Sequence, residues 1–246
     1  ALTWLGMYRI PVVLLSATLP PARRRALLDV YRRGRGSSGE GAESVEGVIG
    51  YPVISTLSAA GVHVHEITGE AEDPKRIIPT SLGSPDEIAE LLERELANGG
   101  CAVVIRNTVR EAQETYDAVK AVFGREQTTL LHSRFLAAER AARDRRMLEL
   151  FGKGVTRRPQ RHVVVATQVI EQSLDVDFDL MLTDPAPMDL VLQRIGRLHR
   201  HERADRPVGL REARCLVLVE DLFAVPWAYS TGTDHVYPRH AVLRTL

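Results

Sequence analysis

The sequence of 246 residues predicts an α/β fold in which a parallel sheet carries helices on both faces. From residue 84 onward, short apolar runs alternate with helical patterns, and helical stretches of about 10–15 residues between strands are typical of βαβ units. The runs CAVVI at 101–105 and VVVA at 163–166 are apolar throughout, which indicates strands that are covered on both faces.

The pattern places each element of this sheet in turn. Residues 85–97 form an amphipathic helix with Ile88, Leu92 and Leu96 on one side, and Gly99 ends it. We expect further helices at 109–123, 137–151 and 188–199, and strands at 101–105, 128–132, 163–166, 180–183 and 213–219.

Polar clusters follow several of these strands directly. They are Arg106-Asn107-Thr108, His132-Ser133-Arg134, Thr167-Gln168 and Asp184. Ligands of open parallel sheets bind beyond the carboxyl ends of the strands, so these clusters mark the candidate site.

The region before residue 84 is organised differently. An apolar run at 11–15 predicts a strand, and a helix is expected between the proline pair at 20–21 and Gly34. The stretch that follows is rich in glycine and serine and indicates a linker. We therefore expect the end of one domain at 1–36, a flexible linker at 37–50 and a second domain at 51–246, with short strands at its edge.

Composition restricts the class of protein. The formal net charge is zero and no apolar stretch of 18 residues occurs, so neither a charged partner nor a membrane span is indicated. Cys101 and Cys215 lie in apolar runs, as reduced strand residues of a cytoplasmic protein do. His63 and His65 alternate along one run, but no third ligand is near them, so no metal site is expected.

Four short motifs, taken in order, resemble those of superfamily 2 helicases. They are SAT at 16–18, VVIRNT at 103–108, VVVATQVIEQSLDVD at 163–177 and QRIGRLHR at 193–200. Within that superfamily, LLHSRF at 130–135 and the last two motifs resemble most the DExH-type helicase–nucleases of type I CRISPR systems. The resemblance implies a RecA-like sheet, with the second RecA-like domain of a helicase preceded by a remnant of the first.

The resemblance assigns the ATP site to two motifs. Gln193, Arg197 and Arg200 are spaced four and three residues apart, which would place them on one face of a helix. By resemblance Arg200 is the arginine finger, Arg197 contacts the γ-phosphate and Gln193 supports both, and all three are classed as catalytic. Asp175 would accept a hydrogen bond from the ribose, with Asp177 as a substitute. A solvated basic helix, or a surface that binds nucleic acid, is the alternative for the arginines.

Arg194 lies on the same predicted helix and points in another direction. We expect it to be a structural ion-pair partner.

The resemblance also assigns contacts to nucleic acid. Thr108 and Thr167 would hold phosphates of a single strand, although each could equally cap a helix. Asn107, Arg134 and Gln168 are expected as secondary contacts. Ser16 and Thr18 would couple the hydrolysis site to the DNA site.

The implied protein is an ATP-dependent DNA helicase of CRISPR interference that also carries a nuclease. The sequence has no GxxxxGK[ST] loop, no DExH-type acidic motif and no His-Asp pair, so most ligands of ATP and Mg²⁺ are expected elsewhere and this chain alone is expected to be inactive. Single-stranded DNA and an RNA-guided CRISPR surveillance complex are the implied partners. A helicase acting on RNA, or a non-catalytic RecA-like docking module, are the alternatives.

Overall fold

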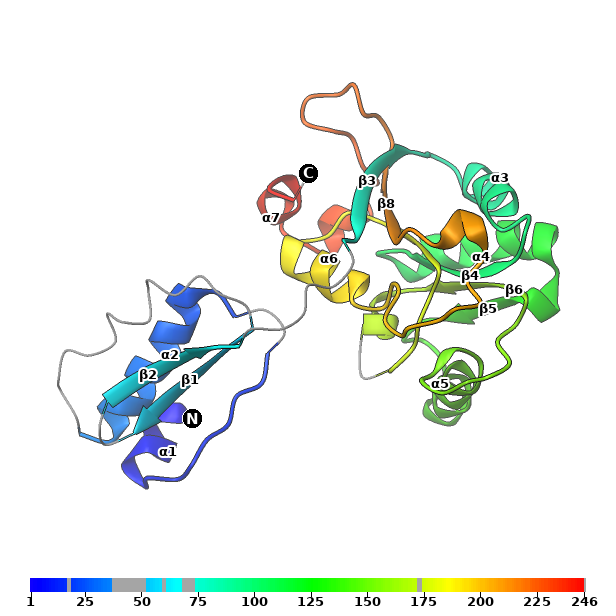
Figure 1. The fold of residues 1–246 in the computed structure, drawn as a ribbon. Coiled ribbons are helices and arrows are strands. Elements are labelled where there is room, and N and C mark those ends of the chain that lie inside the picture. Colours follow the sequence, from blue (N-terminus) through cyan, green and yellow to red (C-terminus); the bar gives the residue numbers. More distant parts are fainter. Residues whose placement is uncertain (17–18, 37–51, 59–60, 68–73, 172–173, 246) are drawn as a thin grey trace. The chain divides into compact units, whose positions relative to one another are not determined.

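The computed structural model describes residues 1–16, 19–36, 52–58, 61–67, 74–171 and 174–245. They form two compact units, Ala1–Glu72 and Asp73–Leu246 (Figure 1). The expected linker at 37–50 lies outside the described residues. The units divide between Glu72 and Asp73, which differs from the expected start of the second domain at residue 51.

The second unit is built on a six-stranded sheet with the order β3-β8-β7-β4-β6-β5, in which every pairing is parallel. The strands are β3 (Arg76–Ser81), β4 (Gly100–Ile105), β5 (Thr128–Leu131), β6 (Arg161–Ala166), β7 (Leu180–Thr183) and β8 (Arg214–Val219). The apolar runs of β4 and β6 are buried at the centre, and Val103 pairs with Val164 of β6 and Met181 of β7. The predicted parallel sheet is confirmed.

Helices cover both faces of this sheet (Figure 1). On one face, α3 (Pro85–Glu95) and α4 (Val109–Phe123) bury Leu92 and Val119 against the strands. On the other face, α5 (Ala137–Phe151) and α6 (Met188–Ile195) bury Phe151 and Val191. The short helix α7 (Arg239–Leu243) follows near the end of the chain. No helix in the described part of the chain has both the length and the apolar character needed to cross a membrane.

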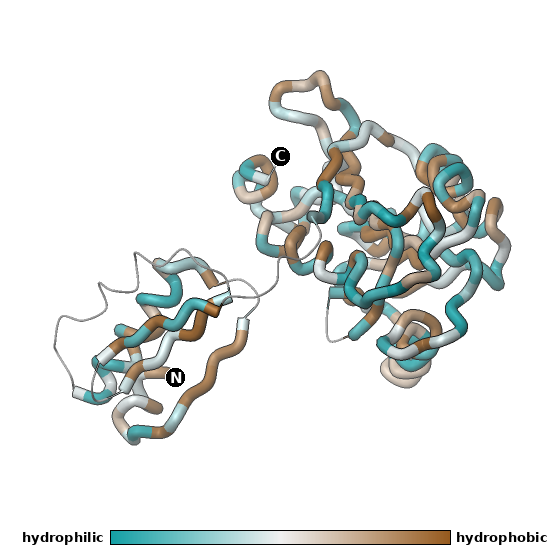
Figure 2. Tube along the Cα trace, in the orientation of Figure 1, coloured by the Kyte–Doolittle hydropathy of each residue, from teal (hydrophilic) through white to brown (hydrophobic). Residues whose placement is uncertain are grey.

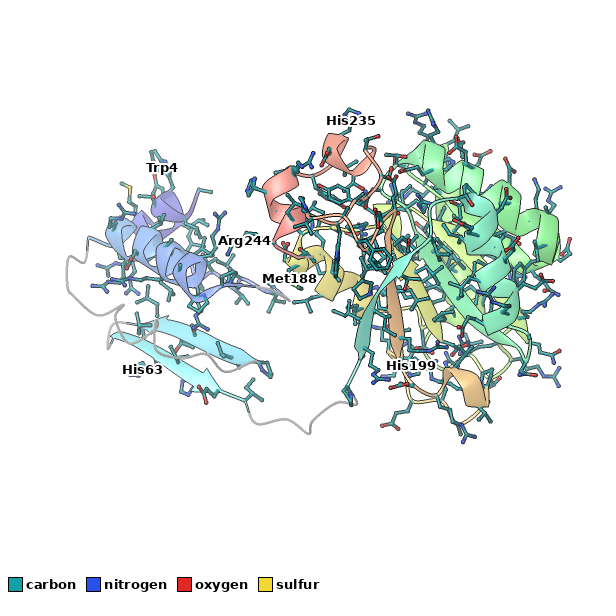
Figure 3. The ribbon with its side chains drawn as sticks, turned by 90° about the horizontal axis from the view of Figure 1, so that it is seen from above. Trp4, His63, Met188, His199, His235 and Arg244 are labelled. Atoms are coloured by element: carbon teal, nitrogen blue, oxygen red, sulfur yellow. The ribbon has the colours of Figure 1, made fainter. Side chains whose placement is uncertain are left out.

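The helix expected at 188–199 is shorter than predicted, because α6 ends at Ile195. The next residues turn away to pair with Phe178. The main-chain N–H of Phe178 donates to the carbonyl of Arg197 at 3.0 Å, and the N–H of His199 donates back to Phe178 at 3.0 Å. His199, labelled in Figure 3, takes φ of 46° to make this turn. Arg197 and Arg200 therefore do not share a helix with Gln193, and that expectation is wrong.

The described residues of the first unit form two helices and one hairpin. The helices are α1 (Leu2–Met7) and α2 (Pro21–Gly34), and the antiparallel strands are β1 (Val53–Ser58) and β2 (Gly61–Glu66). The helices approach closely at two glycines. A Cβ on Gly6 would lie 2.4 Å from the carbonyl of Tyr31, so only glycine allows this contact.

The strand expected at 11–15 is absent, and this prediction is wrong. Among the described residues no strand pairs with this run, and an extended segment without a ladder partner leaves its apolar side chains uncovered. Val13 is 81% exposed and Leu15 is 92% exposed. The run is the brown stretch of the first unit in Figure 2.

Candidate ATP and nucleic-acid site

The carboxyl ends of β4, β6 and β7 bring the predicted polar clusters together. These strands are neighbours, so the residues that follow Ile105, Ala166 and Thr183 meet at one edge of the sheet. The side chain of Gln168 donates to the carbonyl of Asn107 at 2.9 Å, and the main-chain N–H of Asn107 donates to Asp184 Oδ2 at 2.7 Å. The structure thus joins clusters that lie far apart in the sequence.

Thr108 caps the helix α4. Its Oγ1 accepts from the main-chain N–H of Glu111 at 3.2 Å and donates to Glu111 Oε2 at 2.6 Å, and Glu111 bonds back to the N–H of Thr108. This capping box is one of the two roles expected for Thr108. Thr167 is buried after β6, and its N–H donates to the carbonyl of Leu131. The predicted phosphate contacts of both threonines stay predictions.

The secondary contacts differ in what they can offer a ligand. The amide of Asn107 is buried and donates to the carbonyl of Pro185 and to Thr233 Oγ1, at 2.8 and 2.9 Å. Asn107 and Gln168 therefore hold neighbouring loops in place. Arg134 follows β5 and is exposed, so its guanidinium can reach a ligand directly.

Ser16 and Thr18 cannot be related to this edge of the sheet. Ser16 is described within the first unit, and Thr18 lies outside the described residues. Their coupling role stays a prediction.

Arg194 is the buried centre of the site, and its expected structural role is confirmed. Its guanidinium is fully buried and bonds Glu171 Oε1 at 2.7 Å. It also donates to Thr183 Oγ1 at 2.7 Å and to the carbonyl of Asp184 at 3.0 Å. Further bonds reach Asn107 Oδ1 at 3.2 Å and the hydroxyl of Tyr237 at 3.0 Å.

Sequence reasoning missed the roles of Thr183, Thr233 and Tyr237 in this network. Only Tyr237 had a signal, since it lies in a tail, VYPRHAVLRTL, that resembles the region after the last helicase motif.

Arg197 lies half-buried just after α6, and its guanidinium is only partly hydrogen-bonded to the described residues. One terminal nitrogen donates to the carbonyl of Glu171 at 3.1 Å. Its Nε is buried and has no acceptor among the described residues. Burial and the nearby charge of Arg200 lower the pKa of Arg197, so the guanidinium sits where an anion would be favourable. Gln193 is half-buried on the last turn of α6.

Arg200 and Asp175 are paired with each other. Arg200 Nε lies 2.5 Å from Asp175 Oδ1, and both side chains are partly exposed. The hydrogen bond from Arg200 holds the pKa of Asp175 below its usual value. Asp175, predicted to bind the ribose, and Arg200, the predicted arginine finger, are therefore side by side. The helix that was expected to align Arg197 and Arg200 ends before both of these arginines.

Asp177 is fully buried and cannot take the place of Asp175 at a ribose, so that expectation is wrong. Arg203 Nε donates to Asp177 Oδ2 at 2.7 Å, and Arg206 donates to both carboxylate oxygens at 2.9 Å. Burial alone raises the pKa of Asp177, but hydrogen bonds from Arg206 and Arg203, with the charges of Arg206 and Arg158, hold it below its usual value. Both oxygens of the carboxylate are thus bonded inside the domain.

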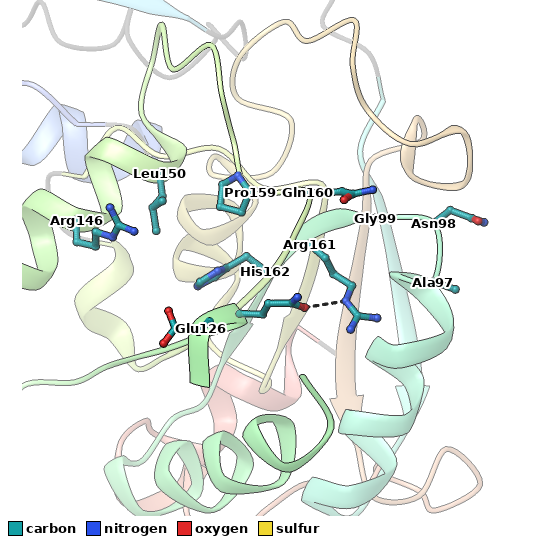
Figure 4. Close-up of a pocket in the computed structure, with 11 residues that line it drawn as sticks. Ala97, Asn98, Gly99, Glu126, Arg146, Leu150, Pro159, Gln160, Arg161 and His162 are labelled. Carbon is teal, nitrogen blue, oxygen red and sulfur yellow. Dashed lines mark hydrogen bonds between the residues drawn. The ribbon is translucent and has the colours of Figure 1, made fainter. Parts of the chain in front are cut away.

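A separate pocket of about 760 Å³ lies at the opposite, amino-terminal ends of β4 and β6 (Figure 4). Its lining includes Arg146, Gln160, Arg161 and His162, and Arg161 bonds Gln127 at 3.0 Å. None of the predicted ATP or nucleic-acid contacts is among its lining residues. The pocket is therefore distinct from the candidate site.

His162 should make the stability of the second unit depend on pH. Burial, followed by the charge of Arg146, lowers the pKa of His162 to about 4, against an unfolded value near 6.5. The unfolded chain therefore binds the proton first, and stability falls as pH drops from 6.5 towards 4. At pH 5 the loss is on the order of 2 kcal/mol. Urea denaturation of the chain and of His162→Gln at pH 7.5 and 5.0 checks this, and equal losses in both proteins would contradict it.

A parallel α/β domain that carries three of the predicted motifs in order, at 103–108, 163–177 and 193–200, defines the second RecA-like half of a superfamily 2 helicase. Residues 98–203 match the family model described as CRISPR-associated nuclease/helicase Cas3, C-terminal. The CRISPR-associated nuclease/helicase Cas3 of Streptococcus thermophilus is 36% identical over 249 residues, which cover 100% of this chain and 26% of that protein. The chain belongs to the Cas3 family and corresponds to its C-terminal helicase region.

Solved structures agree with this assignment. The crystal structure of T. fusca Cas3 with ATP has a TM-score of 0.87 and 34% identity, covering 99% of this chain and 30% of that chain. A chain in a CRISPR RNA-guided surveillance complex before nicking has a TM-score of 0.82 and 34% identity, covering 99% of this chain and 32% of that chain. This chain spans about a quarter of the length of the first three curated relatives that it matches.

Proposed function

We propose that this chain supplies the γ-phosphate side of the ATP site in an ATP-dependent DNA helicase of CRISPR interference. The observation that carries the proposal is Arg197, whose buried Nε has no acceptor among the described residues, with Arg200 close by. Two neighbouring guanidinium groups suit the equatorial oxygens of a transferring phosphoryl group, where negative charge builds in the transition state. Asp175 would bind the ribose once Arg200 turns from it to the phosphate.

The proposal gives each phosphate contact a physical reason. ATP would supply the acceptor that Arg197 Nε lacks, and its negative charge would offset the mutual repulsion of Arg197 and Arg200. In the part of the chain that the structure describes, no cluster of three or more His, Cys, Asp or Glu side chains is placed to hold a metal ion. We propose that the Mg²⁺ which accompanies ATP is held mainly by residues outside this chain.

Single-stranded DNA is the proposed second ligand. Thr108, Thr167 and Arg134 follow three strands of the same sheet, so all three residues lie at its carboxyl edge. Contacts to phosphates carry no sequence information, as a motor that moves on arbitrary DNA requires. Asn107 and Gln168 would shape this track by holding the loops that carry the threonines.

The wider role follows from relatives and is proposed on that basis. Relatives are described as nuclease/helicases, and one solved relative lies in an RNA-guided surveillance complex. We propose that the whole protein is recruited by such a complex in the cytoplasm, unwinds target DNA and degrades it through a nuclease domain. A non-catalytic docking module would not need Arg197 and Arg200 close to each other, and this arrangement favours the motor.

Phosphate release tests the proposal and separates DNA from RNA. With the full-length protein, single-stranded DNA should stimulate ATP hydrolysis strongly, and RNA of equal length should not. This chain of 246 residues alone should release no phosphate above background with either nucleic acid. Stimulation by RNA alone would support the helicase acting on RNA. Hydrolysis by the isolated chain, or none by the full-length protein, would overturn the proposal.

A further inference from the structure

The main chain at Arg200 is held by one buried carboxylate, that of Asp177. Asp177 Oδ1 accepts from the main-chain N–H of Arg200 at 2.7 Å and from that of His201 at 3.4 Å. The side chain of Arg200 itself bonds only partly exposed Asp175 and the carbonyl of Gly196 among the described residues. The firm attachment of this residue is therefore through its main chain.

We propose that Asp177 is a positioning residue for Arg200, which sets where the arginine finger stands relative to the sheet. The inference rests on the proposed function of Arg200 in ATP hydrolysis. Asp177 touches no nucleotide in this proposal and acts only through the main chain at 200–201.

Asp177 can do this because it is itself fixed from several sides. Arg203, which bonds Asp177, also donates to the carbonyls of Val155 and Gly152 at 3.1 Å each, in the loop after α5. Arg206, which bonds both carboxylate oxygens, also donates to the carbonyl of His201 at 2.8 Å. Through these arginines the carboxylate is connected to the loop after α5 and to His201, at the end of the segment 197–201 that carries Arg200.

The neighbouring residues extend the same support. The main chain of Phe178 bonds to Arg197 and His199, so residues 177–178 hold the segment 197–201 alongside them. His199 adopts a positive φ, which few residues with a side chain adopt. A shift of about 1 Å in a catalytic group can cost 10²-fold in rate, so a fixed main chain matters for a finger on an irregular segment.

Asp179 provides a matched control for this inference. It is also buried and also holds Arg206 and Arg158. However, it accepts from the main-chain N–H of Cys101 at 2.7 Å and makes no described bond to Arg200. Replacing Asp179 with asparagine removes the same charge from the same cluster without releasing the finger.

The test uses the full-length protein with Asp177→Asn, Asp179→Asn and Arg200→Ala. An amide has one acceptor oxygen, which the buried arginines will claim, so its NH₂ group will face the N–H of Arg200. Asp177→Asn should lower kcat for DNA-stimulated ATP hydrolysis roughly 10- to 100-fold with little change in KM for ATP. Asp179→Asn should stay within about threefold of the unmodified kcat. Denaturation curves establish that each variant is folded at the assay temperature.

The double variant separates positioning from general damage. In an Arg200→Ala background, Asp177→Asn should cause no further loss of kcat, because the residue that it positions is gone. Equal kcat values for Asp177→Asn and Asp179→Asn, or additive losses in the double variant, would overturn the inference. If Arg200→Ala itself leaves kcat unchanged, the proposed function fails instead, so the two failures are distinguishable.

Discussion

Arg200→Ala in the full-length protein should lower kcat for DNA-stimulated ATP hydrolysis by roughly 10³-fold or more, the range observed for arginine fingers. The loss is expected in kcat because the guanidinium stabilises charge that develops in the transition state. Arg200→Lys should recover little of this loss, since an ammonium lacks the planar fork that fits two phosphate oxygens. Steady-state phosphate release at saturating DNA measures the effect.

Arg211→Ala is the control for removal of an exposed arginine. Arg211 is exposed, follows the short helix before β8, and makes no described side-chain bond. Its replacement should leave kcat unchanged. DNA affinity, measured by fluorescence anisotropy, addresses the alternative that Arg200 belongs to a basic surface. Weaker DNA binding with an unchanged kcat at saturating DNA would support that surface and contradict the finger.

Arg194→Met should cost this chain about 3–5 kcal/mol of unfolding free energy, because it leaves buried partners of a charged group unpaired. Glu171 would lose its ion-pair partner, while Asn107 Oδ1 and Thr183 Oγ1 would each lose a buried donor. Urea denaturation followed by circular dichroism measures the loss. Arg194→Lys should not restore stability, since one ammonium cannot span five acceptors that surround a planar group.

Arg110→Ala is the matched comparison for Arg194. Arg110 pairs with Glu114 at 3.0 Å on the surface of α4, with its side chain 86% exposed. Exposed pairs of this kind contribute roughly 0.3–0.5 kcal/mol, so the change should be small. A loss for Arg194→Met as small as that for Arg110→Ala would mean that water replaces the buried network. It would contradict the claim that Arg194 stabilises the fold.

The fold of the second unit was predictable because its signals are local and repeated. The helices α4 and α5 begin and end where the sequence pattern placed them, and so does β7. The strands are apolar throughout, which is the mark of a sheet buried on both faces. Since parallel strands end at one edge, the meeting of Asn107, Gln168 and Asp184 followed from the sheet alone.

The end of α6 was not predictable from periodicity, because the residues after it satisfy a helical pattern equally well. What ends the helix is pairing with Phe178, a contact between distant parts of the chain. The same limit applies to Asp177, whose burial beneath Arg203 and Arg206 depends on packing. Local spacing carries no information about such partners. The apolar run at 11–15 shows the converse, since strand composition without a ladder partner gave no strand.

The order of strands in the sheet has a consequence for how the protein is made on the ribosome. β3 is the first strand of this sheet to be synthesised, yet among the described strands it pairs only with β8, which is the last. Until β8 emerges, the edge of β3 has no partner within the sheet, and such unpaired edges invite association with other chains. The segment 197–201, which carries Arg197 and Arg200, lies between β7 and β8, so it leaves the ribosome before the sheet is completed. Assembly of the sheet therefore finishes when the residues proposed to bind ATP are already present.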